Sequence, residues 1–207
     1  MPSKSTDGAR VTGGGTGGAE RPGKDGVYLW GLTLDQAIFL TFLGALIGFY
    51  KGFGRLNLHV PGSSGLVWIA VMVVGRTVVP RRLAGTWLGT VAGALAVFLG
   101  EGREGPLVFL KYFLPGVTLD LLFLTPWGRR DPVPLAVAGG LFGALAHLTK
   151  LLASYIAGRI IGVPQFFLTL GLLPSAVSHA VFGCLGGYLG VVIGSRFPPR
   201  QIHRGNT

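Results

Sequence analysis

Six long apolar runs follow one another along this chain, and they limit its fold more than any other feature. Most of them are close to the roughly 17–25 residues that an α-helix needs to cross about 30 Å of hydrocarbon. We therefore expect an all-α integral membrane protein, folded as a bundle of about six transmembrane helices. The runs cover residues 32–50, 65–79, 83–99, 106–125, 133–161 and 166–193.

The charge content supports lipid as the main solvent of this chain. Only 13% of the residues are charged and 49% are hydrophobic, whereas about 25% of the residues of a soluble domain are charged. The net charge is +10, but the basic residues lie mostly between and beyond the apolar runs. This distribution is typical of a membrane protein and argues against a nucleic-acid partner. The single cysteine, Cys184, excludes an intramolecular disulfide.

The positions of the lysines and arginines predict an orientation in the membrane. With the N-terminus inside, 12 of the 18 Lys and Arg residues fall on the cytoplasmic side, which agrees with the positive-inside rule. An even number of helices then places the C-terminus inside as well. We expect a disordered cytoplasmic tail at 1–26, a transmembrane domain at 27–196 and a second cytoplasmic tail at 197–207, in a plasma or inner membrane.

Small residues recur four positions apart in most of the runs. In lipid, such stripes allow two helix backbones to approach closely. Packing inside the bundle is one interpretation, and a docking face for a partner membrane protein is the other. The stripe of Ala37, Thr41 and Ala45 in the first run is the best candidate for docking. The glycine stripes are Gly44 with Gly48, Gly89 with Gly93, Gly139 with Gly143, and Gly186 with Gly190 and Gly194.

Cationic and titratable residues from three runs are expected at a similar depth in the outer half of the bundle. They are Lys111, His147, Lys150 and His179. His147, Lys150 and Ser154 are three and four residues apart, so they share one helix face. A pocket lined by these side chains would bind an anionic or acceptor-rich small molecule. The alternative is that the lysines extend separately toward water and the histidines are bonded within the core.

The longest outer connection, residues 51–64, mixes glycine and proline with Asn57 and His59. This composition suggests a folded lid over the outer pocket, although an ordinary interfacial loop has the same composition. We include Asn57 and His59 among the candidate binding residues.

Two charged residues are expected within the cytoplasmic half of the transmembrane bundle. Asp120 and Arg76 fall at similar depths on different helices, and we predict an ion pair between them because an unpaired charge there is unfavourable. Two prolines, Pro115 and Pro174, lie within apolar runs. Each is predicted to free a backbone carbonyl about four residues earlier.

Motifs of catalysis are missing from the sequence. Residues 18–25 read GAERPGKD, which resembles a P-loop but ends in Asp where Ser or Thr must reach Mg²⁺. The chain has no HExxH and no GxSxG motif. The spacing of His59, His147 and His179 matches no metal signature. We predict no enzymatic activity, no cofactor and no metal site.

The architecture resembles the substrate-binding subunit, or S component, of an energy-coupling factor (ECF) transporter. The resemblance rests on the six short helices, on the small-residue stripe at 37–45, and on residues 56–76, which read LNLHVPGSSGLVWIAVMVVGR. It implies that the outer side captures a vitamin or metal, with helices four to six and the first outer loop forming the site. It also implies partners: a transmembrane coupling subunit, which meets the helix-one alanine motif, and two cytoplasmic ATPases. In this chain Thr41 stands at the middle of that motif.

The leading hypothesis is therefore a substrate-capture subunit for ATP-driven uptake of a small water-soluble micronutrient. A self-contained channel or secondary transporter is the first rival, and it predicts paired intramembrane acids or two related halves. A membrane enzyme or an assembly factor is the second rival. Uptake of a divalent metal held by His59 and its neighbours is a variant of the leading hypothesis.

Overall fold

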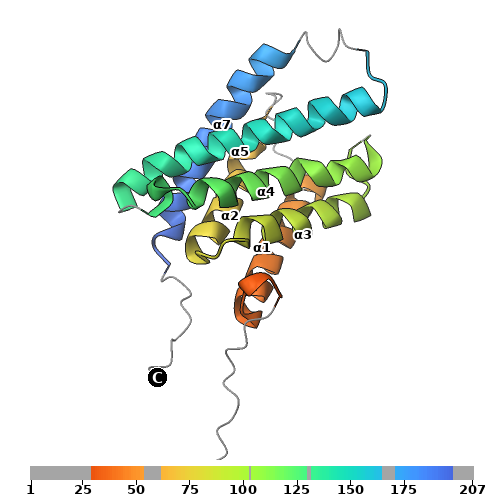
Figure 1. Cartoon of the computed structure of the whole chain (residues 1–207). Coiled ribbons are helices and arrows are strands. Elements are labelled where there is room, and N and C mark those ends of the chain that lie inside the picture. The colour runs from red at the N-terminus through yellow and green to blue at the C-terminus, as the bar shows by residue number, and fades with distance from the viewer. Residues whose placement is uncertain (1–28, 54–61, 103, 130–131, 165–170, 198–207) are drawn as a thin grey trace, which may run out of the picture.

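The structure, a computed structural model, is all-helical wherever it describes the chain, and the helices pack side by side in one bundle (Figure 1). It describes residues 29–53, 62–102, 104–129, 132–164 and 171–197. The α-helices are α1 (Leu34–Phe53), α2 (Gly65–Val78), α3 (Ala84–Phe98), α4 (Leu110–Phe123), α5 (Pro132–Ile160) and α7 (Leu172–Gly194). The short 3₁₀ segments are η1 (Leu29–Gly31), η2 (Gly105–Phe109) and η3 (Pro126–Arg129).

Four of the described segments are long and apolar enough to cross a membrane. They are Leu34–Phe53, Gly105–Phe123, Leu135–Ile160 and Leu172–Gly194. The helices α2 and α3 are equally apolar but shorter. These lengths and compositions define an all-α, multi-pass membrane protein. Six crossings with both termini inside remain a prediction.

Glycine lets the helices of the bundle touch through their backbones, and α7 is the clearest case. A Cβ added at Gly186 would come 2.7 Å from the carbonyl oxygen of Leu66 in α2, and one at Gly190 would come 2.7 Å from that of Ala70. On another side of α7, Gly183 and Gly187 meet the backbone of α5 in the same way. Close approach of this kind is how helices gain packing energy in lipid. The glycine stripe at 186–194 is therefore an internal packing surface.

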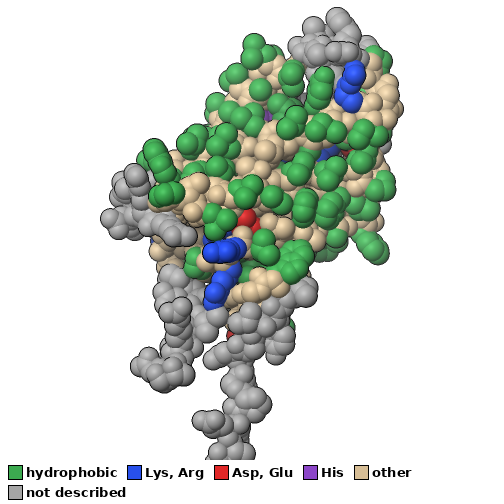
Figure 2. Space-filling view, viewed as in Figure 1, with side chains coloured by type: hydrophobic (Ala, Val, Ile, Leu, Met, Phe, Trp, Pro, Cys, Tyr) green, Lys and Arg blue, Asp and Glu red, His purple; other side chains and the backbone are tan. Residues whose placement is uncertain are grey.

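Helix α1 lies at the edge of the bundle and packs mainly on α3. Gly44 and Gly48 face Val91 and Leu95 of α3, so this stripe is also used for internal packing. The outward side of α1 exposes large apolar side chains: Leu34, Ile38, Phe42, Leu46, Phe49 and Phe53. Hydrophobic side chains are spread over the whole described face that Figure 2 shows, and charged side chains are few there.

The stripe predicted to dock a partner borders the contact between α1 and α3. Ala37 and Ala45 are half-buried and Thr41 is exposed. The Thr41 hydroxyl accepts a hydrogen bond of 2.9 Å from the indole Nε1 of Trp87 in α3. Part of the stripe thus contacts the protein's own bundle, and its role in docking remains a prediction.

The two prolines behave differently. Pro115 lies inside α4 and is buried there, where it removes the N–H that would bond to the carbonyl of Lys111. The prediction for Pro174 was wrong, because α7 begins at Leu172 and Pro174 occupies its first turn. The N–H groups of a first turn have no partner within the helix, so proline interrupts nothing at that position. Residues 166–170, which begin the sixth apolar run, are outside the described part of the chain.

Candidate binding site at the lysine end

Three lysines from three helices meet at one end of the bundle, which we call the lysine end. They are Lys51 in the last turn of α1, Lys111 in the first turn of α4 and Lys150 in α5. The Lys51 ammonium donates a 2.6 Å hydrogen bond to the hydroxyl of Ser64, just before α2. Lys51 and Lys111 are both close enough to act electrostatically on Lys150. The cationic cluster predicted from Lys111 and Lys150 is therefore present, and it includes Lys51 as well.

Two carboxylates share this end of the bundle. Glu104 accepts a 2.5 Å ion-paired hydrogen bond from Lys111. Glu101 accepts a 2.5 Å hydrogen bond from the hydroxyl of Tyr112 and is also an electrostatic neighbour of Lys150. These contacts reduce the positive character expected of the site. Three lysines still face two carboxylates, so the formal charges of these five side chains sum to +1.

The two histidines lie against each other between α5 and α7. His147 is fully buried, and its ring centroid is 4.3 Å from that of His179. The Nδ1 of His147 is 2.9 Å from the carbonyl oxygen of His179, and the Nδ1 of His179 is 2.8 Å from that of Ser175. A carbonyl only accepts, so each Nδ1 must carry the proton. In the neutral imidazole, Nε2 is then an acceptor directed away from these bonds.

Trp68 of α2 forms the centre of the site, and we did not predict it from the sequence. It is fully buried, and its ring packs edge-on against His147 at 5.4 Å and against Tyr112 at 5.9 Å. The Lys150 ammonium lies 5.4 Å from the centre of the same ring, a cation–π distance. Trp68 lies in the same turn of α2 as Gly65, whose missing side chain leaves room for the His147 ring.

A buried donor and a buried acceptor lack partners at this site. Within the described part of the chain, neither Nε1 of Trp68 nor Nε2 of His147 makes a hydrogen bond. Buried polar groups are nearly always paired, with protein, water or ligand. Together with the ammonium groups, the two atoms give the site unused capacity both to donate and to accept. A small polar molecule with anionic or carbonyl oxygens matches this capacity.

The other predicted binding residues contribute less to this picture. The Ser154 hydroxyl donates a 3.0 Å bond to the carbonyl of Lys150, one turn earlier in the same helix. Asn57 and His59, with the lid that they were expected to form, lie outside the described residues. Among the residues that the structure does describe, no three His, Cys, Asp or Glu side chains are grouped for a metal ion.

The opposite end of the bundle, which we call the arginine end, contains Arg76, Arg81 and Arg82. Arg76 forms the ion pair predicted for it, with its Nε 2.9 Å from Oδ1 of Asp120, and both residues are buried. Asp120 also accepts bonds from the backbone N–H groups of Gly85 (2.9 Å) and Thr86 (2.6 Å) and from the Thr86 hydroxyl (2.7 Å). Asp120 of α4 thus caps the N-terminus of α3, where a negative charge is favourable.

No protein-family model, curated protein or solved structure matches this chain. The class of the protein therefore rests on its own features. It is an all-α, multi-pass membrane protein that has a buried ion pair at one end and a cluster of lysine, histidine and tryptophan at the other.

Proposed function

We propose that this protein is the substrate-capture subunit of an ECF-type uptake system and that its cargo binds at the lysine end. The cargo is a small, water-soluble and vitamin-like molecule that carries anionic or carbonyl oxygens. In this proposal the six helices cross the membrane, both termini are cytoplasmic and the lysine end faces outward. A separate coupling subunit and two ATPases supply the energy.

The observation that carries the proposal is the unfilled hydrogen-bonding capacity beside Trp68. Its Nε1 is a buried donor and Nε2 of His147 is a buried acceptor, and neither has a partner among the described residues. The Lys150 ammonium lies over the same indole ring. A protein seldom buries such groups around a site with no ligand, because an unpaired buried polar group costs about 1–3 kcal/mol.

The arginine end supports capture over autonomous transport. A secondary transporter or channel with a proton relay needs an intramembrane acid that can exchange its partners. Asp120 is engaged by Arg76 and by three donors of Gly85 and Thr86, so it is poorly suited to such a relay. The exposed Arg82 and Arg196 and the partly exposed Arg81 favour a cytoplasmic location for this end, under the positive-inside rule.

Co-purification in mild detergent from the native cells tests the proposal. Mass spectrometry should find a transmembrane coupling subunit, ATPases and a bound small molecule. Recovery of the protein alone and empty, from cells that do make such subunits, would overturn the proposal in favour of an autonomous carrier.

Matched substitutions locate the cargo. Lys150→Ala and His179→Ala should release it, whereas Arg159→Gln removes an exposed cation from the same helix as Lys150 and should leave it bound. Unchanged retention in Lys150→Ala and His179→Ala would show that the cargo does not bind at the lysine end.

A further inference from the structure

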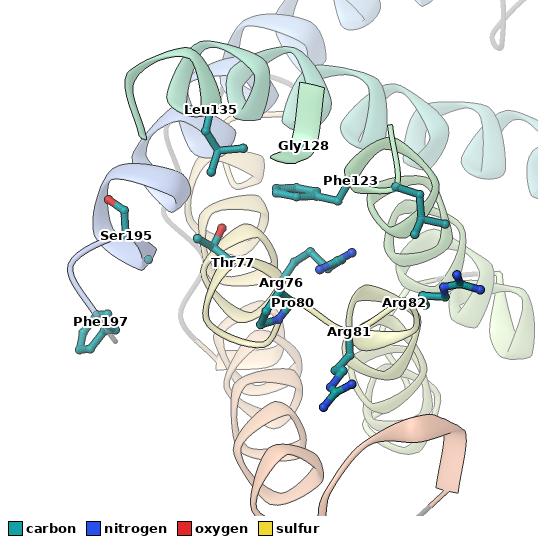
Figure 3. Close-up of a pocket in the computed structure, with 12 residues that line it drawn as sticks. Arg76, Thr77, Pro80, Arg81, Arg82, Phe123, Gly128, Leu135, Ser195 and Phe197 are labelled. Atoms are coloured by element: carbon teal, nitrogen blue, oxygen red, sulfur yellow. The ribbon is translucent and has the colours of Figure 1, made fainter. Parts of the chain in front are cut away.

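A cavity opens at the arginine end, on the far side of the bundle from the proposed cargo site. It has a volume of about 590 Å³ and lies between the ends of α2, α4, α5 and α7 (Figure 3). Arg76 and Phe123 project toward each other in it, and Leu135 enters from α5. Arg81 and Arg82 lie at one rim, and Ser195 and Phe197 of the α7 end lie across from them.

The charge of this cavity is unbalanced. Arg76 is neutralised by Asp120 at 2.9 Å. Arg81 and Arg82 line the same cavity, and the structure records no ion pair or hydrogen bond of either side chain with a described residue. An occupant that balances this charge must be anionic.

The rest of the lining is apolar or can only accept hydrogen bonds. Phe123 and Leu135 supply apolar walls. The hydroxyls of Thr77 and Ser195 donate to backbone carbonyls of their own helices, at 2.8 Å and 3.1 Å. Their protons are therefore committed, and their lone pairs are free to accept a bond from a hydroxyl of the occupant. The cavity thus combines a cationic rim, apolar walls and acceptor oxygens.

We propose that this cavity binds the head group of an anionic phospholipid, with the phosphate at the Arg81–Arg82 rim and the upper acyl chain along Phe123 and Leu135. Arginine binds phosphate in a bidentate manner. Basic pockets between transmembrane helices near the membrane surface are typical sites for anionic lipid head groups. A hydroxylated head group such as glycerol would also bond to Thr77 and Ser195. This proposal does not depend on the cargo proposed above.

Native mass spectrometry of the full chain in detergent, titrated with dioleoyl phosphatidylglycerol, tests the proposal. Phosphatidylglycerol should bind more tightly than dioleoyl phosphatidylcholine. The double variant Arg81→Gln/Arg82→Gln should lower its affinity roughly 25-fold, at about fivefold for each arginine near an anionic surface. Arg196→Gln is the matched control, since Arg196 is exposed close to this end without lining the cavity. It should change the affinity less than twofold.

Leu135→Trp tests whether the lipid binds in the cavity or on the charged surface around it. The larger side chain fills the cavity beside its apolar wall and leaves the charge unchanged. It should weaken phosphatidylglycerol binding, and thermal unfolding in detergent checks that the variant is folded. If the Leu135→Trp protein does not fold, Arg81→Gln/Arg82→Gln alone tests the proposal, because Arg81 and Arg82 lie at the rim of the cavity.

Three results would overturn the proposal. Phosphatidylcholine could bind as tightly as phosphatidylglycerol, or Arg196→Gln could match the double variant, and either would show a nonspecific surface effect. Glycerol phosphate or inorganic phosphate could displace the lipid at equal concentration, which would assign the cavity to a soluble phosphate compound.

Discussion

The two ends of this bundle bury cations in opposite ways. At the arginine end, the carboxylate of Asp120 is ion-paired with Arg76 and accepts hydrogen bonds from three donors at the start of α3. At the lysine end, three ammonium groups share two carboxylates, and buried polar atoms of Trp68 and His147 lack described partners. The two ends therefore differ in how their carboxylates are used: Asp120 has four partners and joins α2, α3 and α4, whereas the cluster at the lysine end matches the cargo proposed above.

The largest expected effect on stability comes from breaking the ion pair of Arg76 and Asp120. Asp120→Ala leaves Arg76 as an uncompensated buried charge and removes the cap of α3. We expect a loss of about 3–5 kcal/mol in the free energy of unfolding, measured by denaturant titration in detergent micelles. Thr86→Val is the matched control, because it removes only one hydroxyl bond and should cost about 0.6 kcal/mol. Equal losses in the two variants would mean that the pair does not stabilise the bundle.

A smaller loss of stability is expected when a side chain is added next to His147 at the lysine end. Gly65 lies so close to the His147 ring that a Cβ would overlap its atoms. Gly65→Ala should therefore displace the imidazole, destabilise the protein by about 1–3 kcal/mol and weaken binding of the proposed cargo. In Gly52→Ala the new Cβ meets only the end of the Leu99 side chain, at 3.3 Å, so stability and cargo should be retained. A Gly65→Ala protein as stable as wild type would contradict this packing.

Removing a cation from the lysine end should raise the stability of the protein, whereas breaking the Arg76–Asp120 pair should lower it. Lys51 and Lys111 repel the charge of Lys150, and the attraction of Glu101 offsets only part of this repulsion. Lys150→Met relieves that repulsion and keeps the aliphatic chain over Trp68. We expect stability to rise by up to about 1 kcal/mol while cargo is lost, measured by thermal unfolding and by mass spectrometry of the purified protein. A loss of stability as large as that of Asp120→Ala would remove the contrast between the two ends.

The smallest expected loss of stability comes from removing an uncharged hydrogen bond between two helices, and it serves as a reference for the other variants. Trp87→Phe deletes the hydrogen bond to Thr41 at the edge of α1. Interhelical hydrogen bonds in membranes average about 0.6 kcal/mol, and we expect a loss of that size by the same denaturant titration. A loss above that of Gly65→Ala would show that this contact anchors α1 more strongly than its exposure suggests.

Hydropathy alone located the helices well. The predicted run 65–79 corresponds to α2 (Gly65–Val78), and 83–99 corresponds to α3 (Ala84–Phe98). Counting depth along the runs was also enough to pair Arg76 with Asp120, because few charges lie so deep and each requires a partner. Glycine spacing identified surfaces of close packing, although it did not show which helices meet there.

The features that could not be predicted from the sequence depend on how each helix is rotated about its axis and on which helices pack together. In the sequence Trp68 is one more apolar residue of its run, because its position against His147 follows from the rotation of α2. The bond between Glu104 and Lys111 depends on the short segment η2, which has no signal in hydropathy. The capping of α3 by Asp120 joins residues 34 and 35 positions apart, and no local pattern predicts such a bond.

The ion pair also has a consequence for biogenesis. Arg76 precedes Asp120 by 44 positions in the chain, so a ribosome delivers the cation to the translocon well before its partner. Arg76 lies in the last turn of α2, so its charge opposes insertion by less than the about 2.5–3.5 kcal/mol of an arginine at the centre of a helix. Before α4 has been synthesised, we expect the long Arg76 side chain to extend toward the membrane surface, as arginines near helix ends do. The contact with Asp120 then forms as a late step, which fixes α2 against α4 once both helices have been made.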